Sequence, residues 1–179
     1  MRQSNLFLLA TIFVLFTIIW VLAAGFGSPV AIFAGFIFGK WIGTLLLVVG
    51  LSIGATLLYI FANFFFKEMI KEKFLNKYQN LEIKFKKSEF IYLLIYRLVG
   101  GIPFAISNVL PCIFNVKISN FFWATFIGII PSLFLICSIG SGLEKIIDQN
   151  LTAPTPLDLI TSPDIYIPLI IFTCLVLTT

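Results

Sequence analysis

The sequence predicts an all-α integral membrane protein, with transmembrane helices and two oppositely oriented re-entrant helical hairpins that form an inverted repeat. The chain of 179 residues is 60% hydrophobic and 11% charged, whereas a soluble domain carries roughly 25% charged residues. Its uncharged runs are long, and two apolar stretches are broken by glycine and proline. The uncharged runs are Gln3–Gly39, Trp41–Phe66, Leu98–Val116 and Ile118–Leu143.

Residues 1–24 are expected to hold the first transmembrane helix. Leu6–Ala24 is uncharged and close to the roughly 20 apolar residues that cross a hydrocarbon core of about 30 Å. It is longer than the apolar region of a secretory signal, about 7–15 residues, and no small-residue cleavage pattern follows it. We therefore interpret it as a retained span.

Residues 25–142 are expected to form one membrane domain that opens with a re-entrant hairpin. Ser28–Gly39 is too short to cross a bilayer and contains several glycines. Non-helical backbone at membrane depth must be buried in protein or line a water-filled cavity. We expect Pro29, Gly35 and Gly39 to shape this hairpin.

Two further crossings are predicted inside this domain, at Thr44–Phe66 and Ile118–Gly140. Glycines four residues apart let the backbones of two membrane helices approach closely. A proline inside a helix bends it, because it removes a backbone donor and clashes with the preceding turn. The residues predicted to pack or bend these helices are Gly50, Gly54, Gly128 and Pro131.

Residues 67–89 form the one strongly polar stretch, with seven lysines and four glutamates. Its apolar residues recur at helical spacing, which predicts an amphipathic helix at the membrane interface. The alternative is a solvated helix that packs on the protein itself. Because positively charged loops stay in the cytoplasm, we expect this segment and the N-terminus to be cytoplasmic, in a multi-pass protein of the inner (plasma) membrane.

A second hairpin is predicted within Phe90–Val116, where Gly101 and Pro103 interrupt the helix. An offset of 74 residues pairs Pro29 with Pro103 and Gly54 with Gly128. This offset is the sequence indication of an inverted repeat, which is typical of transporters that bind substrate near the bilayer midplane.

Arg97 is the outstanding candidate for a functional residue, because it lies within the apolar run Ile91–Val99. A charge inside a membrane is costly and marks function by default, and a guanidinium suits a phosphate group. The structural alternative is that Arg97 caps carbonyls freed at the hairpin turn or extends to the headgroup layer. Ser107 and Asn108 are expected either to satisfy hairpin backbone or to line a polar cavity with Arg97 as substrate-binding residues.

Residues 143–164 are expected to form an external loop, and residues 165–179 to begin a C-terminal transmembrane helix that the chain leaves unfinished. Histidine is absent and the three cysteines are isolated, so we expect no metal site and no cofactor. Paired carboxylates and a nucleophile with its base are also missing, which argues against an enzyme. The modest basic stretch, interleaved with glutamate, argues against nucleic-acid binding.

Two segments resemble the VTT-domain (DedA, SNARE-associated Golgi protein) superfamily over about residues 25–142. The first half is carried by Ser28–Pro29 and Ala34–Gly39. The second is carried by Arg97, Gly101–Phe104 and Asn108, in the pattern R-x(3)-G-x-P-F-x(3)-N, followed by Gly128–Pro131. This pattern is similar to the subgroup of the yeast Golgi protein and its bacterial relatives.

The resemblance implies facing re-entrant hairpins and a role in lipid translocation or scrambling, of phospholipid or polyprenyl phosphate, and in membrane homeostasis. Membrane lipids with anionic headgroups would be the partners, and a homo-oligomer remains an option. Because the first hairpin lacks the acidic residues of the DedA branch, proton coupling is not expected to follow that branch. The alternative function is a membrane organiser that acts through its amphipathic helix without transporting lipid.

Overall fold

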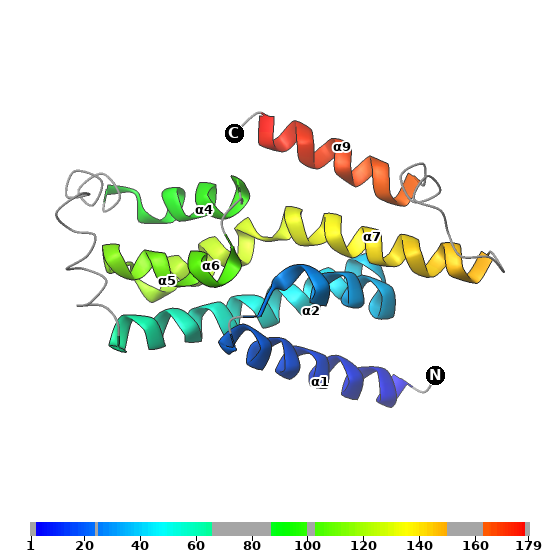
Figure 1. Cartoon of the computed structure of the whole chain (residues 1–179), viewed down its shortest axis with the longest axis horizontal. Coiled ribbons are helices and arrows are strands. Elements are labelled where there is room, and N and C mark those ends of the chain that lie inside the picture. The colour runs from blue at the N-terminus through cyan, green and yellow to red at the C-terminus, as the bar shows by residue number, and fades with distance from the viewer. Residues whose placement is uncertain (1–2, 24, 66–86, 100–102, 150–162, 178–179) are drawn as a thin grey trace.

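The computed structural model describes residues 3–23, 25–65, 87–99, 103–149 and 163–177. All regular secondary structure in these ranges is helical (Figure 1). The helices are α1 (Gln3–Leu22), α2 (Gly27–Phe65), α4 (Glu89–Val99), α5 (Phe104–Val109), the short 3₁₀ helix η1 (Leu110–Phe114), α6 (Ile118–Gly128), α7 (Ile130–Gln149) and α9 (Pro163–Leu177).

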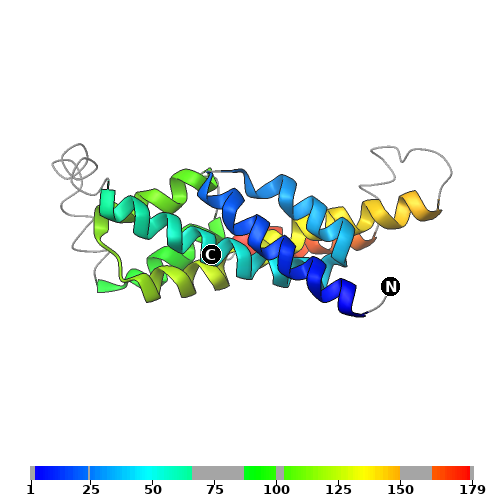
Figure 2. The same cartoon turned by 90° about the horizontal axis from the view of Figure 1, so that it is seen from below.

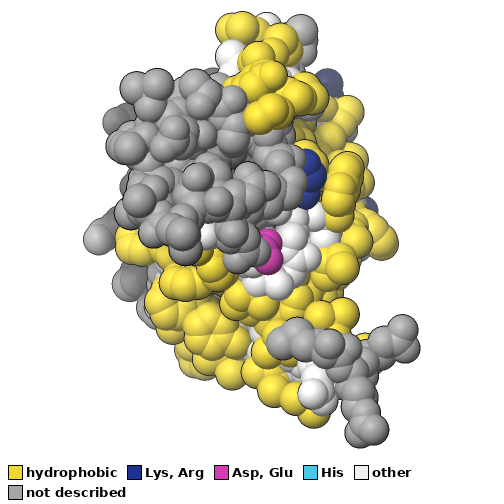
Figure 3. Space-filling model, turned by 90° about the vertical axis from the view of Figure 1, so that its right-hand side faces the viewer, with side chains coloured by type: hydrophobic (Ala, Val, Ile, Leu, Met, Phe, Trp, Pro, Cys, Tyr) yellow, Lys and Arg dark blue, Asp and Glu magenta, His cyan; other side chains and the backbone are white. Residues whose placement is uncertain are grey.

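Three helical segments are long and apolar enough to cross a membrane, namely Asn5–Leu22, Gly27–Phe65 and Ile118–Glu144. Large apolar side chains cover much of the described surface, and Phe7 is 78% exposed. Figure 3 shows hydrophobic side chains over most of the described part of one face. The prediction of an all-helical, multi-pass membrane protein is therefore confirmed.

Hydroxyl groups within these helices bond to carbonyls of the same helix, as suits a chain surrounded by lipid. Each donates to the carbonyl four residues earlier, at 2.5–2.9 Å, and these donors are Thr11, Thr17, Thr44, Thr56 and Ser138. These five hydroxyl groups are thus satisfied within their own helices.

Helix α2 reverses its direction at Gly39 (Figures 1 and 2). The backbone of Gly39 has φ 74° and ψ 170°, which lies outside the helical region and is open essentially to glycine alone. A Cβ atom added to Gly43 would lie 2.6 Å from the carbonyl oxygen of Ala34. Residues 27–38 and 40–65 are therefore two helical arms that fold back against each other.

Glycines bring the first arm of α2 into backbone contact with α7. A Cβ atom on Gly35 would overlap the backbone of Cys137, and one on Gly140 would overlap the carbonyl of Ile32. The second arm of α2 meets α1 in the same way. Added Cβ atoms on Gly50 and Gly54 would lie 3.0 Å from Thr17 and 2.9 Å from Val21.

A tight turn connects α1 to α2. The indole Nε1 of Trp20 donates to the carbonyl of Phe26 at 3.0 Å, and the backbone N–H of Gly25 donates to the carbonyl of Trp20 at 2.9 Å. A Cβ atom on Gly25 would overlap the Trp20 indole. Glycine is thus required where the indole closes the turn.

Helix α4 packs against α6 in the second half of the domain, and α5 and η1 pack against α2. Pro103 stands at the N-cap of α5, and Asn115 ends η1 in the left-handed conformation, with φ 48° and ψ 53°. The carboxylate of Glu89 accepts from the backbone N–H of Lys117 at 3.4 Å and from Asn120 Nδ2 at 2.9 Å. The start of α4 is therefore held beside the start of α6.

The core consists of two clusters that both involve the second arm of α2. One joins α1, α2 and α7 around Leu47 and Leu51, and the other joins α2, α4, η1 and α6 around Tyr59 and Phe121. Phe104 packs against both clusters. The first residue of α5 therefore lies where the two halves of the molecule meet.

Several boundaries differ from the sequence expectations. Helix α7 continues to Gln149, although a loop was expected from residue 143, because Glu144 and Lys145 extend a helix readily once it leaves an apolar environment. The bend predicted near Pro131 lies at Ile129, between α6 and α7. Residues 67–86 of the amphipathic segment and most of the loop at 143–164 lie outside the described residues.

Candidate functional site

Arg97 is buried in the last turn of α4, with 6% of the residue exposed. Its Nε donates to Thr125 Oγ1 at 3.2 Å, one terminal nitrogen donates to Ser107 Oγ at 2.6 Å, and the other donates to Asn108 Oδ1 at 2.7 Å. A buried charge is costly unless hydrogen bonds satisfy it. Three side chains from α5 and α6 satisfy three of its N–H groups.

Two aromatic rings complete the surroundings of the guanidinium. Its central carbon lies 5.5 Å from the ring centroid of Phe104 and 5.2 Å from that of Phe121. A cation within about 6 Å of an aromatic face is attracted by the ring quadrupole, by about 2 kcal/mol or more when the pair is desolvated. The rings thus stabilise the charge from α5 and α6.

Gly128 provides the space in which Arg97 leaves α4. A Cβ atom on Gly128 would lie 2.6 Å from the Arg97 Cβ and 3.3 Å from the carbonyl oxygen of Leu94. Any larger residue would separate α6 from α4 at the level of the guanidinium. Gly128, which the sequence predicted as a helix-packing residue, therefore also makes room for the Arg97 side chain.

The positive charge has no carboxylate partner among the hydrogen bonds that the structure describes. The groups that accept from Arg97 are two hydroxyls and an amide carbonyl. A guanidinium has five N–H donors, and three of them are used. Within the described residues, two N–H groups and the full positive charge remain available to an anion.

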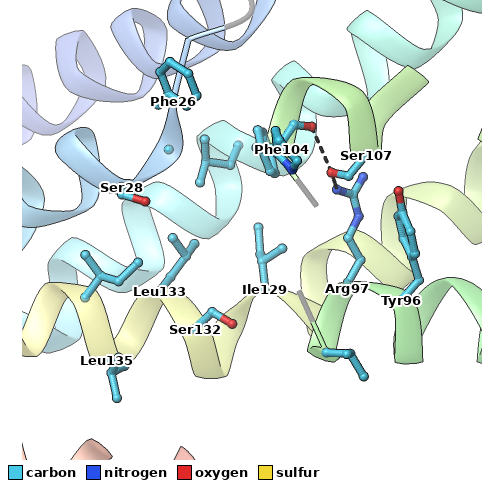
Figure 4. A pocket seen from close by; sticks show the side chains of 15 residues that line it. Phe26, Ser28, Tyr96, Arg97, Phe104, Ser107, Ile129, Ser132, Leu133 and Leu135 are labelled. Carbon is cyan, nitrogen blue, oxygen red and sulfur yellow. Dashed lines mark hydrogen bonds between the residues drawn. The ribbon is translucent and has the colours of Figure 1, made fainter. Parts of the chain in front are cut away.

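A cavity of about 580 Å³ lies beside the guanidinium (Figure 4). Five polar residues line it, namely Arg97, Tyr96, Ser107, Ser28 and Ser132. The rest of the lining consists of apolar side chains and one glycine. The remaining lining residues are Phe26, Gly27, Leu51, Val99, Pro103, Phe104, Ile129, Leu133, Leu135 and Ile136.

The two interhelical turns meet at this cavity. Phe26–Ser28 comes from the turn between α1 and α2, and Val99 and Pro103 flank the turn between α4 and α5. The end of α1 and the start of α2 lie near the middle of the long axis of the molecule in Figures 1 and 2, and so do the end of α4 and the start of α5. The sequence predicted that Ser28–Gly39 forms half of a re-entrant hairpin. In the structure a regular helical arm begins at Gly27, directly after the turn that follows α1, and ends where the chain reverses at Gly39.

The residues chosen from the sequence divide between the site and its scaffold. Arg97, Ser107 and Pro103 line the cavity, whereas Asn108 is fully buried and bonds to Arg97 without contributing to the lining. Pro29 occupies the first turn of α2. Gly101 lies outside the described residues.

Thr125 and Tyr96 are the site residues that the sequence analysis missed. Thr125 follows Arg97 by 28 positions in the chain, so no local pattern connects the two. A polar residue in an otherwise apolar helix was the signal available for each. The hydrogen bonds of Arg97 run to side chains, whereas the sequence alternative expected carbonyl caps or contact with the headgroup layer.

The fold and this site together define a multi-pass α-helical membrane protein with a buried cation beside a largely apolar, partly open cavity. Residues 25–142 match the model of the VTT domain. The chain therefore belongs to the VTT-domain family of the DedA/SNARE-associated superfamily, as the resemblance predicted.

Two curated proteins illustrate the range of its relatives. The chain is 26% identical over 136 residues to Transmembrane protein 41 homolog of Caenorhabditis elegans, an alignment that covers 72% of this chain and 55% of that protein. It is 30% identical over 141 residues to the uncharacterized protein YqeD of Bacillus subtilis (strain 168), covering 74% of this chain and 67% of that protein. The chain thus spans about half the length of the nematode relative. No solved structure matches it.

Proposed function

We propose that this chain moves lipids with phosphate headgroups, phospholipid or polyprenyl phosphate, across a bilayer and so contributes to membrane homeostasis. The observation that carries the proposal is Arg97, a buried cation with neutral hydrogen-bond partners and two spare N–H groups at the wall of a cavity. Phosphate oxygens are acceptors that arginine binds strongly. The apolar lining suits the adjoining part of a lipid.

In this proposal two helical pairs are re-entrant hairpins that approach the bilayer midplane from opposite faces. The first is α1 with residues 27–38, and the second is α4 with α5 and η1. Residues 27–38 rise roughly 18 Å as a helix, less than a hydrocarbon core of about 30 Å. The proposal is supported by Figure 1, in which the two pairs extend toward opposite ends of the molecule from turns near its centre.

Equivalent packing in the two halves supports an inverted repeat. Gly54 lies against Ile18 and Val21 of α1, which precedes the first turn. Gly128 lies against Leu94 and Arg97 of α4, which precedes the second turn. The 74-residue offset that pairs these glycines in the sequence also pairs their structural roles. Inverted repeats of this kind bind substrate where the halves meet.

The mechanism follows from the cost of moving a phosphate through hydrocarbon. An unpaired charge at the bilayer centre costs several kcal/mol or more. Arg97 would offset that cost with opposite charge and two hydrogen bonds, while the acyl or prenyl chain stays in apolar surroundings. This function is translocation without a covalent step, and the described cavity lining contains no carboxylate, cysteine or histidine.

We place the protein in the inner (plasma) membrane with residues 67–89 in the cytoplasm, since lysine-rich segments stay inside.

The alternative function is a membrane organiser that transports no lipid, and an experiment distinguishes it from a lipid translocator. Deletion of residues 75–87 should leave translocation by purified protein intact if lipid movement is the function.

The test is translocation of fluorescent phospholipid in liposomes that contain purified protein. Arg97→Ala is expected to lower the protein-dependent rate at least tenfold. Arg97→Lys retains the charge but cannot maintain three partners and a ligand together, and it should show an intermediate rate. Lys117→Ala removes a cation outside the cavity and serves as the control. Wild-type rates in a correctly folded Arg97→Ala protein would refute the proposal.

A further inference from the structure

The unsatisfied polar groups around Arg97 all provide hydrogen-bond donors. Two guanidinium N–H groups have no acceptor among the described residues. The hydroxyl of Tyr96 and the Nδ2 of Asn108 are buried and likewise have no partner there. The orientation of the Asn108 amide is fixed, because its Oδ1 accepts from Arg97. The cluster thus has more donors than acceptors.

Such an imbalance favours a ligand that only accepts hydrogen bonds. A buried donor without an acceptor costs about 1–3 kcal/mol, so several of them near one cation are retained at the expense of stability. A phosphate ester offers several acceptor oxygens and a negative charge. A neutral or cationic ligand would leave either the donors or the charge unmatched.

Tyr96 is the donor best positioned to join Arg97 in binding. It precedes Arg97 in α4, and both residues line the same cavity. Figure 4 shows the Tyr96 side chain beside Arg97, with its hydroxyl at the level of the guanidinium. Ser107 also lines the cavity, but its hydroxyl already donates to the carbonyl of Phe104 at 2.8 Å and accepts from Arg97. Asn108 lies outside the lining.

We propose that the Tyr96 hydroxyl is a second ligand-binding donor, which together with Arg97 binds the phosphate of a lipid headgroup. This inference rests on the proposed function and adds to it a residue with an assigned contact. The cavity of about 580 Å³ falls within the range of sites for drug-sized ligands. Since most of its lining is apolar, a free phosphate ion would leave that lining unfilled, whereas a lipid would fill it.

The experiment compares Tyr96→Phe with wild type in lipid binding by the full chain in detergent. Phosphatidic acid is the probe, and inorganic phosphate and diacylglycerol are the two fragments that distinguish headgroup from chain. Tyr92→Phe is the matched control, because Tyr92 lies one turn earlier in α4 and outside the cavity lining. Tyr96→Phe should weaken phosphatidic acid binding about tenfold and leave diacylglycerol binding unchanged, since the variant loses one hydrogen bond to a charged group.

A second readout detects the contact independently of affinity. Fluorotyrosine is incorporated throughout the chain, and the ¹⁹F resonance missing from Tyr96→Phe is assigned to residue 96. Phosphatidic acid should shift this resonance, and diacylglycerol should leave it in place. A merely structural tyrosine would not respond to the phosphate.

The outcomes separate this inference from the proposed function. If Arg97→Ala abolishes translocation while Tyr96→Phe binds phosphatidic acid as wild type does, the Tyr96 contact is refuted and the function survives. Binding of inorganic phosphate as tight as that of phosphatidic acid would refute the lipid assignment. Loss of binding by Tyr92→Phe to the same degree would show a general effect on α4 and refute the contact as well.

Discussion

At the scale of single residues, the protein holds a buried arginine with neutral groups. Removing one acceptor leaves a donor in a position that water does not reach, and the charge loses part of its support. Thr125 is the clearest case, because it is 1% exposed and is the acceptor for the Nε of Arg97. Its hydroxyl can be deleted without changing the volume of the side chain.

Thr125→Val is expected to destabilise the protein by about 1–3 kcal/mol, the cost of a buried unpaired donor. It should also lower lipid translocation severalfold, because the guanidinium loses one of three positioning contacts. Thermal unfolding in detergent and the liposome assay measure the two effects. Thr11→Val is the control, since that exposed hydroxyl bonds only to its own helix. Equal stability of the two variants would contradict this account of the site.

At the scale of elements, glycine decides where the helices turn and how closely they pack. Gly39 turns α2 back on itself by its conformation, and a Cβ atom there would have no neighbour within 4 Å. Gly35 and Gly140 act differently, because an added Cβ atom would meet backbone of the opposite helix. The same residue type thus serves two separate physical purposes.

Gly39→Ala should destabilise the protein by about 1–3 kcal/mol through backbone strain alone. The added methyl group clashes with nothing. Replacement by asparagine should recover none of the loss, because asparagine tolerates positive φ mainly in the αL region, and the ψ of 170° at Gly39 lies outside it. Gly27→Ala, with its nearest neighbour at 4.0 Å, should change little. Unfolding temperatures of the variants measure this order, and equal values for positions 27 and 39 would contradict it.

At the scale of the whole molecule, the arrangement of the turns has a consequence for topology. Figure 1 shows the N-terminus and the Gly39 reversal at one end, and the starts of α4 and α6 at the other. With residues 67–89 cytoplasmic, the N-terminus would then lie outside, in contrast to the sequence expectation. The difference arises because the proposed arrangement makes α1 one arm of a re-entrant hairpin, whereas the sequence predicted a full crossing, for which Asn5–Leu22 is long and apolar enough.

Single cysteines at Asn5, Lys40 and Lys117 test this topology in intact cells, after Cys112, Cys137 and Cys174 are replaced by serine. An impermeant thiol reagent should label positions 5 and 40 from outside and position 117 only after permeabilisation. A cysteine at Ser28 should react poorly from either face, because the proposed turn is deep in the bilayer. Labelling of positions 5 and 117 from the same side would rule out the re-entrant first hairpin.

The sequence by itself determined the class of protein, the segments that are apolar enough to cross a membrane, and Arg97 as the residue to examine. It could do so because hydrophobicity, missing charge and helix-breaking residues act locally. Only the tertiary structure showed that Phe26–Ser28 lines one cavity together with Pro103 and Tyr96. It alone also showed that Thr125 and Phe121 support Arg97. These are contacts between helices that are distant in the chain. They depend on how closely glycines allow the helices to approach each other, and a local sequence pattern does not predict that distance.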